Sequence, residues 1–382
     1  MKHRNLMKIA VSLGLCLGLV AGCGAAASAA SGALDTESMF TDRDCEQSAD
    51  LKGAVEYTVA DGEDITITEA GVYVLTGAAS DATVFVEAGD DDKVQLVLDG
   101  VTVTNTDFPC VYVKSADKVF ITVSADSALS VTGKFTSDGD TNTDGVIFSR
   151  SDLTLNGTAA LTITSTDNGV VCRDDLKITG GTYTVTAASK CFEVHDSIRV
   201  ADGVLVLTAG SDGLHAEDDD DDTTGYIYIG GGDITIRAGD DGVHATTVVQ
   251  IDGGSLSVTA SEGIEASYVQ INGGTVSIAA ADDGINGAYK SSAYRPTIEI
   301  NGGYVTVVMA SGDTDGIDCN GDIIVTGGTI DVTGGSTFDC DGTATYTGGT
   351  IIVNGQQIDY IPSQMGMMGG MMGGFGGRGG RW

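Results

Sequence analysis

The chain has 382 residues and a formal net charge of −35, which comes from 19 basic and 54 acidic side chains. So acidic a surface repels nucleic acid and anionic lipid and attracts cations, which excludes nucleic acid as an expected partner. Aromatic residues make up only 6% of the chain and proline is scarce, a composition that favours a β-solenoid over a β-sandwich.

Residues 1–22 have the pattern of an export signal, which is excluded from the fold. Lys2, Arg4 and Lys8 precede an apolar run over residues 9–19. Residues 20–23, Val-Ala-Gly-Cys, resemble a bacterial lipobox. This pattern predicts lipidation of Cys23, a tether over residues 23–54 and an extracellular, cell-surface lipoprotein that touches the membrane only through its lipid. Cleavage after Ala29, which would give a secreted protein without lipid, is the alternative.

A repeat dominates the rest of the chain. Residues 55–143 are less regular, and we expect them to form N-terminal turns of the same fold. Over residues 144–361 a phrase of acidic, Gly, apolar, polar and small residues recurs about every 21 residues. A constant period in this range is typical of a solenoid. Clear copies begin at Asp212, Asp241, Glu262, Asp283 and Asp315, and weaker ones begin at residues 144, 168, 190 and 336.

Each repeat contains three short runs in which apolar and polar residues alternate, as in Ile264–Ala266, Val269–Ile271 and Val276–Ile278. Period-two alternation indicates β-strands. Gly-Gly pairs such as Gly273-Gly274 separate the second and third runs, and glycine suits a sharp corner because it adopts positive φ without a steric penalty. The predicted fold class is therefore all-β, a parallel β-helix with three strands per turn. Nine turns spaced ~4.8 Å apart would span roughly 43 Å.

Alignment of the copies predicts which residues of the phrase face inward. The third residue is apolar throughout, from Val146 to Phe338, and the fifth is small or apolar, from Phe148 to Cys340. Both should lie inside. The fourth residue then points outward and predicts a polar ladder on one flat face, with the members Glu193, His215, His244, Glu265, Asn286, Asp318 and Asp339.

Cys319 and Cys340 occupy the same inward position one turn apart. Their Cα atoms should lie ~4.8 Å apart, within the range of disulfides, and an exported protein permits oxidation. Stacked buried thiols fit the spacing equally well, so both states stay open. No Cys or His spacing in the chain predicts a zinc site. Residues 362–382 are rich in Met, Gly and Arg without periodicity, which predicts a disordered tail.

Acidic residues on the ladder are candidate metal ligands. Carboxylates stacked ~5 Å apart repel one another, so they must stay solvated or hold a cation between them. Calcium fits because it accepts six to eight oxygen ligands in flexible geometry. For a single Asp, the alternative is that the Asp-Gly pair only favours a turn at a corner of the coil. We expect at least one calcium ion among Asp212, Asp240, Asp241, Glu262, Glu265, Asp282, Asp283, Asn286, Asp315, Asp318 and Asp339.

Two insertions interrupt the period at the same corner, after the fifth position. Residues 217–225 contain five consecutive Asp residues, and residues 288–296 contain Tyr289, Lys290, Tyr294 and Arg295. Tyrosine rings pack on sugar faces and cations pair with sugar carboxylates, so the second loop is a candidate carbohydrate-binding site. A decorated loop without a ligand is the alternative.

His215 and His244 lie in adjacent copies of the outward position, so we expect them to touch. They are candidates for sugar binding and for acid–base chemistry. The alternative is that they are ordinary ladder members, hydrogen-bonded to Glu193 and Glu265.

Three phrases in the N-terminal turns, together with the repeats and the Gly/Met tail, resemble a family of exported clostridial carbohydrate-binding proteins. The phrases are residues 71–77, Gly-Val-Tyr-Val-Leu-Thr-Gly; residues 94–101, Val-Gln-Leu-Val-Leu-Asp-Gly-Val; and residues 111–119, Val-Tyr-Val-Lys-Ser-Ala-Asp-Lys-Val. The resemblance covers about residues 55–361. It implies a right-handed parallel β-helix related to calcium-dependent pectate lyases, which binds cellulose and acidic sugars and carries calcium. Catalysis is not an established property of that family.

The favoured hypothesis is therefore a non-catalytic, monomeric protein that binds plant or cell-wall polysaccharide, including acidic glycan, with calcium as cofactor. A calcium-dependent pectate-type lyase is the second hypothesis, in which Lys290 or Arg295 would act as the base. A structural surface adhesin is the third.

Overall fold

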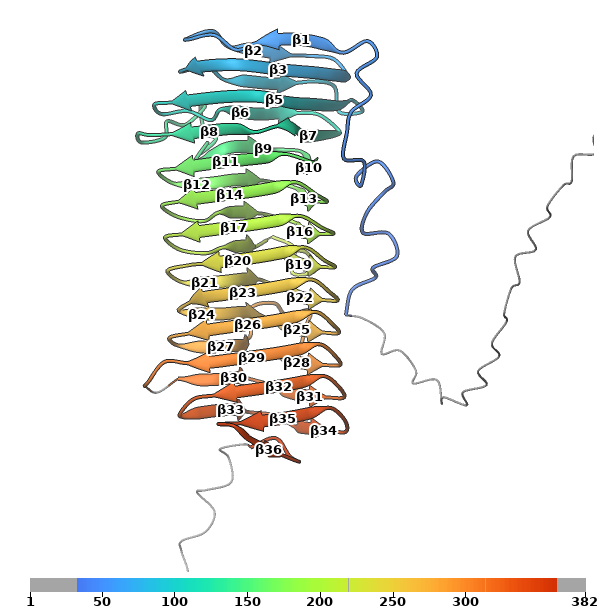
Figure 1. Cartoon of the computed structure of the whole chain (residues 1–382), viewed down its shortest axis with the longest axis vertical. Coiled ribbons are helices and arrows are strands. Elements are labelled where there is room, and N and C mark those ends of the chain that lie inside the picture. Colours follow the sequence, from blue (N-terminus) through green and yellow to red (C-terminus); the bar gives the residue numbers. More distant parts are fainter. Residues whose placement is uncertain (1–32, 219, 313, 363–382) are drawn as a thin grey trace, which may run out of the picture. The chain divides into compact units, whose positions relative to one another are not determined.

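The computed structural model describes residues 33–218, 220–312 and 314–362. Cys23, the export signal and nearly all of the Met-rich tail lie outside the described residues. Strands run from Val55 to Ile358 and stack in successive rungs (Figure 1). They form three ladders, which we call faces 1, 2 and 3.

Face 1 is a separate sheet that contains the repeated acidic-Gly phrase. All its neighbouring strands pair in parallel. Its strands are β2 (Ile65–Ile67), β4 (Val84–Glu87), β6 (Val111–Ser115), β9 (Gly145–Ser149), β12 (Asn168–Cys172), β15 (Phe192–Val194), β18 (Leu214–Ala216), β21 (Asp241–Ala245), β24 (Glu262–Ala266), β27 (Asp283–Gly287), β30 (Asp315–Cys319) and β33 (Ser336–Cys340).

Face 2 follows face 1 within each turn. Its strands are β1 (Val55–Thr58), β7 (Lys118–Ala125), β10 (Asp152–Gly157), β13 (Asp175–Ile178), β16 (Ser197–Val200), β19 (Tyr226–Ile229), β22 (Val248–Ile251), β25 (Tyr268–Ile271), β28 (Thr297–Ile300), β31 (Asp322–Val325) and β34 (Ala344–Tyr346).

Face 3 completes the turn and lies toward the viewer in Figure 1. Its strands are β8 (Ser127–Val131), β11 (Ala160–Ser165), β14 (Thr182–Ala187), β17 (Val204–Ala209), β20 (Asp233–Arg237), β23 (Ser255–Ala260), β26 (Thr275–Ala280), β29 (Tyr304–Met309), β32 (Thr329–Thr333) and β35 (Thr350–Val353). The long strands β3 (Gly71–Ser80) and β5 (Lys93–Asn105) run through faces 2 and 3, and β36 (Gln356–Ile358) pairs antiparallel with β35.

The predicted fold class, an all-β parallel β-helix with three strands per turn, is confirmed. Inward side chains stack in rows of like residues. The row that contains Leu214, Val243 and Ile264 is fully buried, as the alternation predicts. Burial of such rows is the main stabilising contribution, because each rung covers the apolar face of the next.

Glycine has two separate roles in the coil. In the Gly-Gly corners the second residue has positive φ, as at Gly274 with φ 79°. In the acidic-Gly phrase, however, the glycine lies inside a strand. A Cβ on Gly263 would lie 2.3 Å from the carbonyl oxygen of Gly284 on the next rung and 2.5 Å from the Ile278 side chain. The repeated glycine is therefore required by close packing of successive rungs.

The predicted register is wrong by one residue in the first copy of the phrase. Ile147, and not Val146, pairs with Val170, so Phe148 stands at the outward position beside Val171. Phe148 packs edge-on against Tyr112 at 5.5 Å between ring centroids. A small outer aromatic cluster on face 1 explains the shift, because an outward phenylalanine is buried there instead of in the central core.

Cys319 and Cys340 are paired in register on β30 and β33. Both are buried free thiols. This state is one of the two that their spacing left open.

Residues 33–54, which we call the N-terminal strap, pack against face 2 in place of forming a free tether. The amides of Ala33 and Leu34 donate to the side-chain oxygens of Gln270 and Gln250, each at 2.8 Å. The strap thus satisfies outward polar side chains of face 2.

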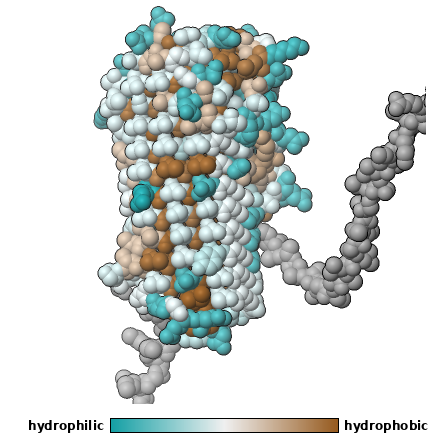
Figure 2. All heavy atoms as spheres, in the orientation of Figure 1, coloured by the Kyte–Doolittle hydropathy of each residue, from teal (hydrophilic) through white to brown (hydrophobic). Residues whose placement is uncertain are grey.

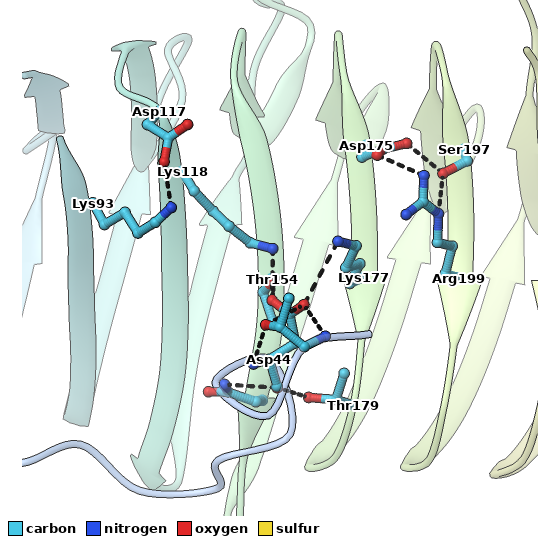
Figure 3. A network of polar contacts seen from close by, with 12 residues as sticks. Asp44, Lys93, Asp117, Lys118, Thr154, Asp175, Lys177, Thr179, Ser197 and Arg199 are labelled. Carbon is cyan, nitrogen blue, oxygen red and sulfur yellow. Dashed lines mark hydrogen bonds and ion pairs between the residues drawn. The ribbon is translucent and has the colours of Figure 1, made fainter. Parts of the chain in front are cut away.

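Asp44 anchors the strap further along face 2 (Figure 3). Its side chain is fully buried, with Oδ1 at 2.6 Å from Lys118 Nζ and Oδ2 at 3.6 Å from Lys177 Nζ. The Thr154 hydroxyl donates to Oδ1 at 3.2 Å. A buried carboxylate between two lysines makes this end of the strap part of the folded unit.

Face 3 is the most regular surface. Figure 2 shows rows of apolar residues between nearly neutral ones on this face. Its outward residues are mostly Thr, Ser and Val, such as Thr275 and Ser277 on β26 and the half-exposed Val204 and Val206 on β17. No long insertion borders it among the described residues 144–309.

Candidate functional site

The outward row of face 1 changes character along the coil. After Thr66, its N-terminal members are apolar or aromatic, and its C-terminal members are polar. In register order they are Thr66, Phe85, Tyr112, Phe148, Val171, Glu193, His215, His244, Glu265, Asn286, Asp318 and Asp339. The predicted polar ladder from Glu193 onward thus forms one continuous row.

His215 and His244 are in contact, as their spacing predicts. Their rings stack at 4.6 Å between centroids with an angle of 16° between planes. Both residues are buried, at 6% and 8% exposure. This burial exceeds what a flat outward row would give, because Glu217 and Lys290 in the two long loops reach over the row.

Each histidine lies beside the acid that starts its own copy of the repeated phrase, three residues earlier in the chain. His215 Nδ1 lies 2.9 Å from Asp212 Oδ2, a charge contact without hydrogen-bond alignment, and its Nε2 lies 3.0 Å from Glu217 Oε2. The hydrogen bond from His215 lowers the pKa of Glu217 to about 2. The expected partner Glu193 instead accepts from the Asn168 side chain.

His244 and Lys290 neutralise the middle of the ladder. His244 Nδ1 lies 2.7 Å from Asp241 Oδ2 and 3.0 Å from Glu265 Oε2, and Lys290 Nζ lies 2.8 Å from the same Glu265 oxygen. Burial alone would lower the pKa of His244, but the hydrogen bonds to both carboxylates outweigh it and raise the pKa to about 9. His244 is therefore a cation at neutral pH, and these two acids have partners within the chain.

Glu262 at the start of the same strand, and the acids of the next two rungs, have no such cation among the described residues and show the opposite electrostatics. Burial and the negative charges of Glu265 and Asp241 raise the pKa of Glu262 to about 7. Burial likewise raises the pKa of Asp283 and of Asp318 to about 6, with neighbouring acids such as Asp315 adding to it. A carboxyl group among uncompensated like charges is the environment that a bound cation relieves.

Asn286 lies in the middle of this acidic group. Its side-chain amide nitrogen donates to Glu262 Oε2 at 3.2 Å and to Glu265 Oε1 at 3.4 Å. Its Oδ1 atom is buried and has no hydrogen-bond partner among the described residues. An orphaned buried carbonyl oxygen beside carboxylates is a ready oxygen ligand for a hard cation.

The remaining predicted ligands lie at the border of the ladder. Asp240 and Asp282 are exposed. The amide of Asp315 donates to Asp283 Oδ1 at 3.3 Å, and Asp315 also accepts from the Ser336 hydroxyl. Asp339 Oδ1 accepts from the Cys340 amide at 2.8 Å.

The residues present fit a calcium ion at one part of the ladder, around Glu262, Asp283, Asn286, Asp315 and Asp318. The set offers only oxygen donors, it contains an orphaned buried oxygen, and its acids are held against like charges. Asp212, Asp241 and Glu265 are instead paired with histidine or lysine.

The two long loops meet over the ladder. The Ser291 hydroxyl donates to the backbone oxygen of Asp222 at 2.7 Å, and Ser292 also bonds to the Asp222 side chain. Two hollows result, of about 260 Å³ and 300 Å³, and Glu217 lines both. The first is otherwise lined by Arg173, Glu193, Val194, His195, His215 and Asp220, and the second by Asp218, Asp222, Thr246, Lys290, Ser291 and Ser292.

The four loop residues predicted to bind sugar are not brought together. Lys290 reaches the ladder, and Tyr289 projects from the loop with 72% exposure. Tyr294 instead packs edge-on against Tyr268 at the start of β25, and Arg295 pairs with Asp322 at 3.0 Å, so both belong to the border of face 2. The loop turns between Lys290 and Tyr294, which sequence spacing does not reveal.

Glu217 is a candidate site residue that the sequence analysis does not single out, because it contacts His215 and lines both hollows. The available signal was its spacing of two residues from His215, which places both side chains on the same side of an extended chain.

Similarity to known proteins agrees with this architecture. A family model described as "Carbohydrate-binding domain-containing protein" matches residues 61–313 and 261–360. The chain belongs to this carbohydrate-binding domain family. The family resemblance seen in the sequence is thereby confirmed.

One relative of this family member is a carbohydrate-binding domain-containing protein of Acetivibrio thermocellus, 37% identical over 129 residues. The match spans 32% of the chain and 45% of that relative. Among solved structures, the polysaccharide lyase-like protein from C. thermocellum, solved as a gadolinium derivative, is similar at a TM-score of 0.52 and 30% identity. That match covers 55% of the chain and 93% of the solved one. The chain therefore has a polysaccharide lyase-like fold.

Proposed function

We propose that this protein binds polysaccharide along face 1, with calcium held at Glu262, Asp283, Asn286, Asp315 and Asp318, and that it does so without cleaving the chain. The observation that carries the proposal is the buried, unpartnered Oδ1 of Asn286 among carboxyl groups of raised pKa. Membership of a carbohydrate-binding domain family supports polysaccharide as the ligand class.

An acidic glycan fits this site only together with the metal. The protein has a formal net charge of −35, so polyuronate and protein repel each other without a cation. Calcium has room for more oxygen ligands than the ladder supplies, and sugar carboxylates can complete its coordination shell. The proposal therefore makes glycan binding calcium-dependent.

The solved relative adds support for a metal. It was solved as a gadolinium derivative, and gadolinium(III) is a hard cation that, like calcium, prefers oxygen ligands. An all-oxygen site on the same fold fits both ions.

A polysaccharide lyase is the second candidate, favoured by the lyase-like fold. It would need a neutral base, and the two candidates that we named are poorly suited. Burial alone would lower the pKa of Lys290, but its hydrogen bond to Glu265 outweighs it and raises the pKa further, so the side chain stays protonated at neutral pH. Arg295 is paired with Asp322 on the far side of the loop.

We also propose that the mature protein is an extracellular monomer anchored through lipidated Cys23. The lipobox-like sequence at residues 20–23 supports the anchor. Among the described residues, no helix is long and apolar enough to cross a membrane.

The test combines metal binding with glycan binding. Calcium titration by calorimetry should give a signal that the double variant Asp283→Asn, Asp318→Asn loses, whereas Asp331→Asn on face 3 keeps it. Pull-down with polygalacturonate should require calcium and fail in the same double variant.

Absorbance of unsaturated products, recorded in the same tubes, separates the two candidate functions. Product that appears with calcium and disappears in Lys290→Ala would establish the lyase. If neither glycan binding nor unsaturated product is detected, the remaining function is a structural surface adhesin.

A further inference from the structure

We infer that His215, His244 and Glu217 form a binding site for a first-row transition-metal ion of the Zn²⁺ type, separate from the proposed calcium site. The nitrogen and oxygen atoms that the three side chains offer all lie within 4.8 Å of one another. The two histidines come from adjacent strands β18 and β21, and Glu217 comes from the start of the loop over residues 217–225.

Carboxylates already orient both histidine rings. Nδ1 of each ring faces the acidic residue three positions earlier in the chain, Asp212 at 2.9 Å for His215 and Asp241 at 2.7 Å for His244. Carboxylates on Nδ1 orient a metal-binding imidazole and make its other nitrogen a stronger ligand. The side for the metal is thus Nε2, and His215 Nε2 already lies 3.0 Å from Glu217 Oε2. The ion takes the place of the Nε2 protons of His215 and His244, so Zn²⁺ binding releases protons and strengthens as pH rises.

The spacing suits a shared ion once the rings turn. Zinc lies ~2.1 Å from an imidazole nitrogen, so two nitrogens on one ion are at most about 4.2 Å apart. The rings stack at 4.6 Å between centroids with 16° between their planes. Because imidazole binds a metal in the plane of its ring, one ring has to rotate out of the stack so that both nitrogens point at the ion.

The donor chemistry distinguishes this site from the all-oxygen group around Asn286. Imidazole nitrogen suits zinc, copper and nickel, whereas calcium prefers oxygen. Two histidines with one carboxylate form a set that zinc uses in sites where a fourth position stays open. His215 and Glu217 also line the 260 Å³ hollow, so an ion held by them would lie within reach of a ligand on face 1.

The site was not expected from the sequence, in which no Cys or His spacing predicts zinc. The two histidines are 29 positions apart and carry no local motif. Only the in-register stacking of β18 on β21 brings them together.

The experiment is Zn²⁺ titration of the untagged protein by calorimetry in millimolar calcium, with Co²⁺ absorption spectra as a second readout. We expect one ion per chain that calcium does not displace. His215→Gln and His244→Gln should each weaken Zn²⁺ binding at least about tenfold and remove the four-coordinate Co²⁺ spectrum. Asp212→Asn should also weaken it by about tenfold or more, because the carboxylate beside Nδ1 of His215 orients that ring.

His195→Asn is the matched control, because His195 lies beside Asp196 and Asp218 in a second cluster on the same face. Zn²⁺ binding that His195→Asn abolishes and His215→Gln preserves would overturn the assignment. So would binding that calcium displaces or that Asp283→Asn, Asp318→Asn removes. Circular dichroism melts in calcium without zinc identify any variant that fails to fold. If a histidine variant fails to fold, Glu217→Gln is used instead, because it changes only an exposed loop side chain, and it should weaken Zn²⁺ binding.

Discussion

Two kinds of charge compensation operate along one row of side chains. At Glu265 the chain provides its own cations, since His244 and Lys290 both contact the same carboxylate oxygen. On the next two rungs, the neighbours that affect the pKa are the Asp315 amide and acids for Asp283, and acids alone for Asp318. The sequence pattern treats all these positions as one repeat, but the residue at each fourth position decides whether the rung needs an external cation.

This difference predicts two pH windows for the stability of the calcium-free protein. The raised pKa values of Glu262, Asp283 and Asp318 mean that the folded state binds extra protons, so stability falls as pH rises from about 4 to 7. His244 has a pKa raised from 6.5 to about 9, so its contribution of about 3 kcal/mol is full below pH 6.5 and lost as pH approaches 9.

Thermal melts between pH 5 and 9 check both windows. We expect the melting temperature to fall across the whole range without calcium, and calcium to restore it mainly near neutral pH. In His244→Gln the decline above pH 7 should disappear, whereas His195→Asn should keep it. A wild-type melting temperature that is constant or rises from pH 5 to 9 would refute the argument.

At the scale of strands, periodicity predicts most of the fold because each rung repeats the same burial problem. Strand identity, inward rows and Gly-Gly corners follow from local patterns of two and about 21 residues. The register prediction is wrong for the first copy because Phe148 could face inward or outward as far as its own sequence neighbours show. Its contact with Tyr112, which is distant in sequence, decides for the outward position. The alternative that Asp-Gly pairs serve as turns does not hold for Gly263, which lies inside β24 and allows close packing between rungs.

The N-terminal strap was not predictable in the same way. It has no repeat, and its partners lie more than 70 residues away, at Lys118, Gln250 and Gln270. The one signal in the sequence is that Gln and Lys side chains recur at outward positions of face 2. A surface in contact with water alone has no need of these residue types, so they indicate a covering segment.

The strap gives a prediction about stability. Asp44→Ala removes the carboxylate between Lys118 and Lys177, which leaves two buried cations without their partner. Loss of one member of a buried ion pair costs about 3–5 kcal/mol. Urea unfolding should show this loss, and the exposed neighbour Asp42→Ala should change stability by less than about 0.5 kcal/mol. Equal stability of Asp44→Ala and wild type would mean that the strap is not docked in solution.

At the scale of the whole coil, the three faces have different coverings. Face 2 is occupied by the strap from β7 to β25, and face 3 presents small hydroxyl and apolar side chains. Face 1 combines long loops, two hollows and unpaired acids in the part of the chain that the structure describes. Regular rungs allow an extended polymer to contact the same row repeatedly, so a polysaccharide gains a small contribution from each rung.

The loop over residues 288–296 then provides the sharpest test of which face binds glycan. Tyr289 and Lys290 border face 1, whereas Tyr294 and Arg295 border face 2. We expect Tyr289→Ala with Lys290→Ala to weaken polygalacturonate binding severalfold in calcium, because the ring packs on sugar and the cation attracts its carboxylate. Tyr294→Ala with Arg295→Ala, and changes at Thr275 and Ser277 on face 3, should leave binding unchanged. If pull-down shows that the Tyr294 and Arg295 changes weaken binding and the Tyr289 and Lys290 changes do not, the glycan binds on face 2. There it would lie beside the surface that the strap already covers.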